Sequence, residues 1–245
     1  MAWGAAPQLT AVIASVAGAN NTYFIRNDGT LWGIGSNSSG QLGMTADSSQ
    51  HPTPTQMGGG NTWIQVGAGS SFMHAIRSDG SLWTWGTNED GQLGYGSKLP
   101  LPHSQQFGSV YKASAGVRHS LVIRASDYSL WSSGQNNYGE VGLAAPDSAA
   151  RPVPQRVLPD TQWADVSAGG YHSLGIMIDG TLWGWGYNAY GQVGDGSITN
   201  RGLPKQIGTD SDWLKVIAAG YSSYALKSDG SLWAWGDNEY GQLGD

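Results

Sequence analysis

Short apolar runs separated by turn residues repeat along the whole chain. Each repeat opens with an apolar run that ends in small residues, as at residues 63–69 and 163–169. A second apolar run follows in the same repeat. Its clearest copies are residues 72–76, 120–123, 173–176 and 224–226. None of these runs has the 3.6-residue period of an amphipathic helix, so the pattern predicts short β-strands.

The dipeptide Asp-Gly follows the second run in four of the repeats. The copies are Asp28-Gly29, Asp79-Gly80, Asp179-Gly180 and Asp229-Gly230. Asp-Gly between apolar strands predicts a β-hairpin with a type I′ turn, in which both central residues have positive φ. The third repeat has Asp127-Tyr128 and one additional residue at this point. We therefore expect a wider turn in that repeat.

A third run, with the pattern Leu-Trp-x-Trp-Gly, follows each turn. Because side chains alternate along a strand, Trp83 and Trp85 lie on one face and Leu82 and Thr84 on the other. The same alternation pairs Trp183 with Trp185 and Trp233 with Trp235. Burying two indoles per repeat would contribute several kcal/mol, at about 25 cal/mol per Å² of apolar area. We expect neighbouring sheets to cover both faces of this strand.

A proline-containing segment ends each repeat. Clear copies are residues 52–57, 152–157 and 203–207. Proline has no N–H to donate to an inner ladder, so these segments belong at the outer edge of a sheet. Each repeat therefore predicts four antiparallel strands.

The glycine before Gln or Glu marks the period of the repeat. Gly40, Gly91, Gly139, Gly191 and Gly241 follow one another at intervals of 51, 48, 52 and 50 residues. A period of this size indicates a propeller or another repeat architecture, and small residues suit the strands around a propeller axis. The sequence predicts an all-β, five-bladed propeller that forms a single domain of residues 1–245. Its units are residues 12–57, 58–107, 108–157, 158–207, and 208–245 together with 5–11.

The assignment of residues 5–11 to the last unit depends on a short internal similarity. The fifth unit has no proline-containing segment of its own, and Pro7-Gln8-Leu9-Thr10 is similar to Pro154-Gln155-Arg156-Val157. We expect the N-terminal strand to complete the last blade and close the ring. The alternative is that two chains share one ring.

Composition excludes several classes of partner and site. Charged residues make up 12% of the chain, but hydrophobic residues at 39% are sufficient for a core. There are 12 Lys and Arg against 18 Asp and Glu, with no basic run, which disfavours nucleic acid as a partner. The absence of cysteine excludes disulfides and thiolate metal sites.

The N-terminal residues carry no pattern of a signal peptide, because residues 1–7 lack a positively charged region and no clean apolar region follows. No apolar run approaches the roughly 20 residues that span a bilayer. We expect a soluble protein without membrane insertion, which is either cytoplasmic or assembled into a virion-like particle.

The sequence contains no catalytic constellation. The nucleophile elbow, the P-loop and the HExxH motif are all absent. His119 and His172 occupy the same position of two repeats, and a residue distributed around a ring does not converge on one site. We expect these histidines to make hydrogen bonds between strands. The prediction is a protein that is not an enzyme and has no catalytic residue, no metal site and no cofactor.

The two variable residues of the Asn-x-x-Gly-Gln segment are the candidate binding positions. Because the residues around them are fixed, these positions should lie on the same rim of every blade. Tyrosine, an amphipathic side chain that suits a contact surface, occupies one of them in three successive repeats. The predicted binding rim consists of Tyr138, Tyr190, Tyr240, Glu89, Asp90 and Glu239. The alternative is that these residues only shield neighbouring loops.

The motifs, taken in order, resemble the repeat of the regulator of chromosome condensation (RCC1) family. The order is Ala-Gly-x-x-His-Ser, as at residues 115–120 and 168–173, then Asp-Gly-x-Leu-Trp-x-Trp-Gly, then Asn-x-x-Gly-Gln-Leu-Gly. The resemblance covers essentially the whole chain and implies a β-propeller. The familiar propeller of that family has seven blades, so five repeats depart from it.

The resemblance also carries expectations about function. The best-known relative is a nucleotide exchange factor that uses a protruding wedge and a basic tail, and neither has a counterpart in this sequence. Other members are binding modules without catalytic activity. We expect an interaction propeller that presents its loops to a protein partner. The alternatives are a structural component of a larger assembly such as a bacteriophage virion, then a carbohydrate-binding propeller, and last a guanine-nucleotide exchange factor.

Overall fold

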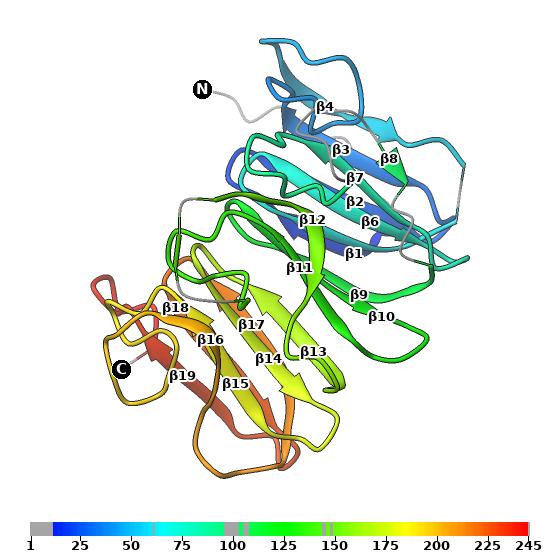
Figure 1. The fold of residues 1–245 in the computed structure, drawn as a ribbon. Coiled ribbons are helices and arrows are strands. Elements are labelled where there is room, and N and C mark those ends of the chain that lie inside the picture. The colour runs from blue at the N-terminus through cyan, green and yellow to red at the C-terminus, as the bar shows by residue number, and fades with distance from the viewer. Residues whose placement is uncertain are drawn as a thin grey trace.

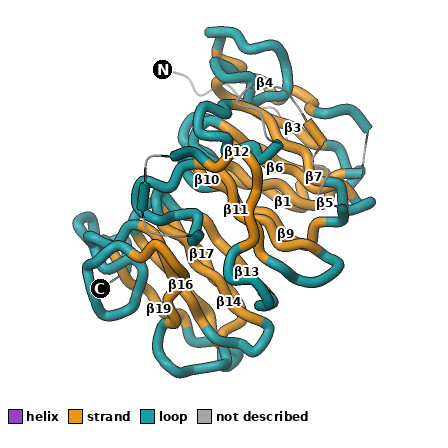
Figure 2. Tube along the Cα trace, viewed as in Figure 1, coloured by secondary structure: helices purple, strands orange, loops and turns teal. Residues whose placement is uncertain are grey.

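Every regular element in the described part of the chain is a β-strand. The structure is a computed structural model that describes residues 12–60, 62–95, 103–104, 108–143, 146–147 and 149–244. The strands form five antiparallel sheets, of which four have four strands and the last has three. The sheets lie one after another along an arc (Figures 1 and 2). We refer to them as blades 1 to 5, in chain order.

The strands of each blade are hydrogen-bonded in chain order, and the first strand of each blade lies on the inside of the arc. Blade 1 contains β1 (Val12–Ala17), β2 (Asn21–Arg26), β3 (Leu31–Ser36) and β4 (Gln50–Met57). Blade 2 contains β5 (Trp63–Ala68), β6 (Phe72–Arg77), β7 (Leu82–Gly86) and β8 (His103–Ser104). Blade 3 contains β9 (Val110–Ala115), β10 (His119–Arg124), β11 (Leu130–Gly134) and β12 (Arg151–Arg156). Blade 4 contains β13 (Trp163–Ala168), β14 (His172–Met177), β15 (Leu182–Gly186) and β16 (Arg201–Gln206), and blade 5 contains β17 (Trp213–Ala219), β18 (Ser222–Lys227) and β19 (Leu232–Gly236).

The proline-containing segments form the outer strands β4, β12 and β16, as predicted. Each of them pairs with one neighbour, the third strand of its own blade. An outer strand has a free side that needs no N–H donor, which is why proline is tolerated there.

The Asp-Gly turns differ from the predicted type I′ geometry. In blade 1 the Gly29 N–H donates to the Arg26 carbonyl oxygen at 2.9 Å, and the Arg26 N–H donates to the Thr30 carbonyl oxygen at 3.0 Å. Gly29 has a φ of 75°, whereas Asp28 is not among the described non-glycine residues with positive φ. This is a three-residue loop, a type I turn followed by a left-handed glycine. The Asp28 carboxylate stabilises it by accepting the Thr30 N–H at 3.0 Å.

The corresponding turn of blade 3 is wider, as predicted. The Tyr128 N–H donates to the Arg124 carbonyl oxygen at 3.1 Å, which adds one residue to the loop. Tyr128 takes the left-handed position with a φ of 55°. Asp127 keeps the role of the other turn aspartates, since its carboxylate accepts the Ser129 N–H at 3.1 Å.

At three of the four boundaries between described blades, the leucine face of one sheet packs against the tryptophan face of the next. Between blades 3 and 4, Leu121 and Leu130 contact a cluster that contains Trp163 and Trp185, all fully buried. The boundaries between blades 1 and 2 and between blades 4 and 5 follow the same scheme, and Leu182 of blade 4 packs with the tryptophan face of blade 5. Between blades 2 and 3, Leu82 packs instead against valine and alanine, with Val110 in the place of the first tryptophan. The prediction that neighbouring sheets cover both faces of the Trp-x-Trp strand is confirmed for the inner blades.

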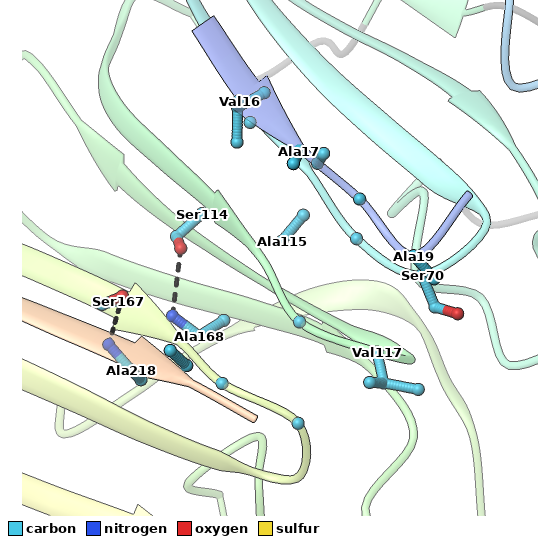
Figure 3. A pocket seen from close by; sticks show the side chains of 18 of the residues that line it. Val16, Ala17, Ala19, Ser70, Ser114, Ala115, Val117, Ser167, Ala168 and Ala218 are labelled. Atoms are coloured by element: carbon cyan, nitrogen blue, oxygen red, sulfur yellow. Dashed lines mark hydrogen bonds between the residues drawn. The ribbon is translucent and has the colours of Figure 1, made fainter. Parts of the chain in front are cut away.

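Backbone hydrogen bonds also join the blades. The turn of each blade offers a carbonyl oxygen to the first strand of the next, as where the Trp213 N–H donates to the Gly180 carbonyl oxygen at 3.2 Å. On the inside of the arc, Ser114 Oγ accepts the Ala168 N–H at 3.0 Å and Ser167 Oγ accepts the Ala218 N–H at 2.9 Å (Figure 3). These side chains connect inner strands that have no ladder between them.

The inner strands surround a cavity of about 510 Å³ lined almost entirely by Gly, Ala, Ser and Val (Figure 3). Small residues are required here because the five inner strands converge. A Cβ at Gly69 would overlap the Gly116 carbonyl oxygen of the next blade. The predicted role of the small residues around the axis agrees with this arrangement.

The described blades form an open arc, and a closed ring is not observed. Blades 1 and 5 lie at opposite ends of the arc (Figure 1). Leu232 of blade 5 is 68% exposed, whereas the equivalent Leu182 of blade 4 is 1% exposed, because no described blade covers blade 5. The strand predicted from residues 5–11 lies outside the described residues, so the structure does not test its pairing with β19.

Candidate binding face

Five tyrosines gather at the end of blades 3, 4 and 5 that is opposite the Asp-Gly turns. They come from three loop positions of the repeat. Tyr171 and Tyr221 precede the second strand, Tyr187 follows the third strand, and Tyr138 and Tyr190 precede the Gly-Gln or Gly-Glu pair. We call these five residues the tyrosine cluster and the end of the arc that carries them the tyrosine face.

The rings of the tyrosine cluster are in mutual contact. Tyr187 lies at the centre, with ring centroids 4.8 Å from Tyr138, 6.3 Å from Tyr190 and 5.7 Å from Tyr221. Tyr171 closes the group, at 5.5 Å from Tyr138 and 6.2 Å from Tyr221. These separations fall in the range of aromatic pairs that stabilise one another by about 0.5–1.5 kcal/mol beyond their buried area.

A rigid turn positions each of the two tyrosines that precede Gly-Glu or Gly-Gln, Tyr138 and Tyr190. In blade 4 the Asn188 side chain accepts the Val193 N–H at 2.9 Å, and the Gln192 side chain accepts the Tyr190 N–H at 3.0 Å. The Gly191 N–H donates to the Asn188 carbonyl oxygen at 2.9 Å. The fixed residues of the Asn-x-x-Gly-Gln segment therefore fold the turn, and the variable residues project from it.

One geometric rule connects the loops of neighbouring blades. The residue before Gly-Gln in one blade contacts the residue that precedes the second strand in the next blade. Between blades 2 and 3 the contact is an ion pair of Asp90 and Arg118, with Arg118 Nη1 at 2.9 Å from Asp90 Oδ2. At the next two boundaries it is aromatic, between Tyr138 and Tyr171 at 5.5 Å and between Tyr190 and Tyr221 at 5.4 Å.

The structure brings together some of the predicted rim residues and separates others. Tyr138 and Tyr190 belong to the tyrosine cluster. Asp90 and Glu89 lie beside it, where Glu89 Oε2 is 3.9 Å from Arg118 Nη1. The hydrogen bond to Asp90 raises the pKa of Arg118. Tyr240 is 85% exposed. By the same rule it would contact a residue of a further blade, and no described residue takes that position. Glu239, next to Tyr240, lies on the same exposed loop.

The tyrosine cluster is accessible. Tyr190 is 49% and Tyr221 is 37% exposed, and the other three tyrosines are half-buried. Within the described residues none of the five hydroxyl groups takes part in a hydrogen bond. Partial burial and the neighbouring tyrosines raise the pKa of Tyr221, so the hydroxyl is protonated at neutral pH. The cluster therefore offers ring faces together with hydroxyl groups.

A buried acid lies under the cluster. Glu140 occupies the position that holds glutamine in the other four repeats, and its Oε2 accepts the Tyr138 N–H at 2.7 Å. Its Oε1 is buried and has no hydrogen-bond partner among the described residues. Burial raises the pKa of Glu140 to about 7, with a smaller contribution from the charge of Asp90.

The repeated histidines make hydrogen bonds between strands, as predicted, and these bonds join neighbouring blades. His119 Nε2 lies 2.9 Å from Ser173 Oγ of the next blade, and Ser173 Oγ donates to the Glu140 carbonyl oxygen at 2.8 Å. Because the serine proton is used for the carbonyl, the histidine must donate from Nε2. His172 and Ser223 repeat the arrangement at 2.9 Å, and so do His74 and Ser120. Burial lowers the pKa of His74 to about 4 and the pKa values of His119 and His172 to about 3, which keeps all three neutral.

No group of three or more His, Asp or Glu side chains in the described residues is arranged to hold a metal ion. The same residues contain no helix with the length and apolar character needed to cross a bilayer.

Sequence reasoning found one of the three tyrosine positions and missed two. Tyr171, Tyr187 and Tyr221 were not predicted, because their positions in the repeat hold unrelated residues in the first three blades. Tyrosine does precede the second strand in both the fourth and the fifth units, whereas the residue after the third strand is aromatic only in the fourth. The repeats alone do not show that the three loops meet at one end of the blade.

Comparison with known proteins gives a consistent result. The family model of the RCC1-like domain matches residues 4–245. The Ultraviolet-B receptor UVR8 of Arabidopsis thaliana is 30% identical over 192 residues, which cover 76% of this chain and 43% of the receptor. The human E3 ubiquitin-protein ligase HERC2 is 28% identical over 192 residues, or 74% of this chain and 4% of HERC2.

Among solved structures, Prp20p from Saccharomyces cerevisiae superposes with a TM-score of 0.81. The sequences are 22% identical, and the superposition covers 95% of this chain and 60% of Prp20p. Prp20p has been described together with its binding properties to Gsp1p and histones. The chain thus spans less than two thirds of each of these relatives, so the activities in their names belong to longer proteins.

Proposed function

Since the chain belongs to the RCC1-like domain family, we propose that it is an interaction propeller whose tyrosine face binds a protein partner. The fold is an RCC1-type β-propeller, as the sequence predicted. The fold alone does not specify a function, so the proposal depends on the residues at the face.

The observation that carries the proposal is the accessible tyrosine cluster. Five contacting tyrosines lie in loops that rigid turns hold in place, and none of their hydroxyl groups is hydrogen-bonded within the described residues. Tyrosine is enriched in protein interfaces because it presents a large contact area and loses little conformational entropy on binding. Contact among the rings further reduces the entropy that binding would remove. The binding of Prp20p to proteins supports the same class of function for this chain.

A comparison of two tyrosine pairs tests this proposal. Tyr190→Ala with Tyr221→Ala removes the exposed half of the cluster. Tyr111 and Tyr128, which also form a contacting and exposed pair at 5.4 Å, lie at the opposite end of the blades and supply the control variant. The partner is recovered with tagged protein from native cells and its yield compared among wild type and the two variants.

We expect the Tyr190/Tyr221 variant to recover at least about tenfold less partner, because loss of one interface hot spot typically costs 2 kcal/mol or more. The Tyr111/Tyr128 variant should recover as much as wild type. Equal recovery by both variants, each with unchanged thermal stability, would refute the assignment of binding to the tyrosine face.

The alternatives remain predictions from sequence. A virion component should be recovered in purified particles, and a carbohydrate-binding propeller should give a glycan-array signal that Tyr190→Ala removes. Neither has a specific observation in its favour among the described residues.

A further inference from the structure

The charges of the tyrosine face leave it acidic. Arg118 is paired with Asp90 at 2.9 Å, Arg151 with Asp147 at 2.7 Å, and Arg201 with Asp195 at 2.5 Å. Arg151 and Arg201 belong to this face because they pair with the last residues of β11 and β15. The arginines at this end of the described blades are therefore neutralised by carboxylates of the same face.

Several carboxylates of this face are left without such neutralisation. Asp237 and Glu239 form no ion pair within the described residues, and the Glu89 side chain, 79% exposed, lies 3.9 Å from the guanidinium that Asp90 already binds. Asp237 and Glu239 flank the cluster on the side of blade 5, and Glu89 flanks it on the side of blade 2. The aromatic surface thus lies between acidic groups.

At the opposite face of the molecule, aromatic rings contact cations of the chain itself. There the chain supplies its own cations, because Arg77 lies 4.6 Å from the ring centroids of Trp63 and Trp83, and Arg124 lies 4.8 Å from that of Trp131. Lys227 lies 4.8 Å from the ring centroid of Trp213. None of the rings of the tyrosine cluster has a cation of the chain over it in the described residues. These ring faces are free to accept a cation from elsewhere.

We propose that the tyrosine face binds an arginine side chain of a basic segment in the protein partner. This inference rests on the proposed function and names the chemistry of its partner. A guanidinium can stack on a tyrosine ring and donate hydrogen bonds to hydroxyl and carboxylate oxygens in the same plane. Tyrosine rings bordered by Glu89, Asp237 and Glu239 provide both kinds of contact. The net charge of −6 favours encounter with a basic segment over long distances.

A pair of matched peptides provides the test. The probe is a nine-residue glycine peptide that carries three arginines, and the control peptide replaces each arginine by citrulline, which has the same shape and no charge. Binding to the full chain is followed by NMR at about 50 mM salt, because screening weakens such contacts at higher salt. The signals are those of ring-labelled tyrosines, assigned by single Tyr→Phe variants.

We expect saturable shifts for Tyr171, Tyr187, Tyr190 and Tyr221, and no shift for Tyr111. Citrulline should weaken binding by about tenfold or more, and Glu89→Gln with Glu239→Gln should weaken binding of the arginine peptide by about threefold or more. These two acids are exposed, so their replacement leaves folding intact. Equal binding of both peptides, or equal shifts at Tyr111, would overturn the inference.

The failure of this inference can be separated from the failure of the proposed function. If the native partner depends on Tyr190 and Tyr221 but the arginine peptide ignores the face, the binding face stands and the arginine chemistry is wrong. If the peptide binds the cluster while the partner is insensitive to Tyr190 and Tyr221, the peptide site stands and the proposed function is wrong.

Discussion

Glu140 shows how one residue can make a single blade respond to pH. The other four repeats have glutamine in its place, and the glutamine side chain accepts the same backbone N–H without carrying a charge. The folded protein raises the pKa of Glu140 to about 7, above the value of 4.5 in the unfolded chain. Between pH 4.5 and 7 the folded state therefore binds more protons than the unfolded state. The stability that the neutral acid provides is complete below pH 4.5 and is lost as the pH rises through 7.

We predict that Glu140→Gln stabilises the protein at pH 8 by about 2 kcal/mol and changes its stability much less at pH 4.5. The reason is that glutamine keeps the hydrogen bond to the Tyr138 N–H and removes the cost of a buried charge. Urea denaturation at the two pH values measures the difference. The prediction fails if the variant and the wild type differ by the same free energy at both.

The buried histidines have the opposite dependence on pH. Their folded pKa values lie below the unfolded value of 6.5, so the unfolded state binds more protons below that pH. Their contribution to stability is complete above pH 6.5 and is lost as the pH falls towards 3. Each histidine adds up to about 1.4 kcal/mol per pH unit to the slope.

For His172→Gln we expect a smaller loss of stability between pH 7 and pH 4.5 than in the wild type, by about 2 kcal/mol. Glutamine can still donate to Ser223 Oγ but takes up no proton. Chemical denaturation across this range gives the slopes. Parallel curves for variant and wild type would mean that His172 is not buried as a neutral ring.

At the scale of the element, the hairpin turn has two functions. It reverses the chain, and its carbonyl oxygen accepts an N–H of the next blade, as Gly180 does for Trp213. The sequence identified these turns correctly, but Asp-Gly occurs both in type I′ turns and at the end of three-residue loops. The longer loop is stabilised by the N–H two residues later, which donates to the aspartate carboxylate, as the Thr30 N–H does to Asp28.

Substitutions of two glycines at equivalent turn positions can distinguish these two functions. Gly180 and Gly230 have φ of 82° and 87°, but a Cβ at Gly180 would overlap the Ser211 carbonyl oxygen of blade 5, whereas a Cβ at Gly230 meets no atom within 4 Å. We predict that Gly230→Ala costs about 1–2 kcal/mol, from left-handed strain alone. Gly180→Ala should cost at least about 1 kcal/mol more, because it also separates two blades. Thermal unfolding of the two variants would decide, and equal losses would rule out the close approach.

At the scale of the whole molecule, each blade depends on the one that follows it. Leu182→Ala should cost about 2–4 kcal/mol, since the side chain is buried between blades 4 and 5. Leu232→Ala, the same change on the uncovered face of blade 5, should cost less than about 0.5 kcal/mol. Denaturant unfolding measures both free energies. A loss of about 2 kcal/mol for Leu232→Ala would show that another part of the molecule covers this face in solution.

The blades were predictable from sequence because each is specified by its own residues. Alternating Trp-x-Trp strands, edge prolines and Asp-Gly turns define four strands within about fifty residues. The curvature of the arc was not predictable, because it depends on the angle at which Leu121 and Leu130 meet Trp163 and Trp185 across a boundary. Only two of the five residues of the tyrosine cluster were predicted, for a similar reason. The pattern of one loop marks Tyr138 and Tyr190, but only the packed blades bring Tyr171, Tyr187 and Tyr221 beside them.

The packing of leucine faces on tryptophan faces has a consequence for synthesis on the ribosome. A blade that has just emerged presents an apolar leucine face, and only the next fifty or so residues can cover it. At a typical ~5–20 residues per second, that face is open for several seconds. Each newly completed blade covers the one before it and exposes a leucine face of its own. At each stage of translation, the most recently completed blade therefore exposes an apolar face. We expect chaperones to bind this face during synthesis.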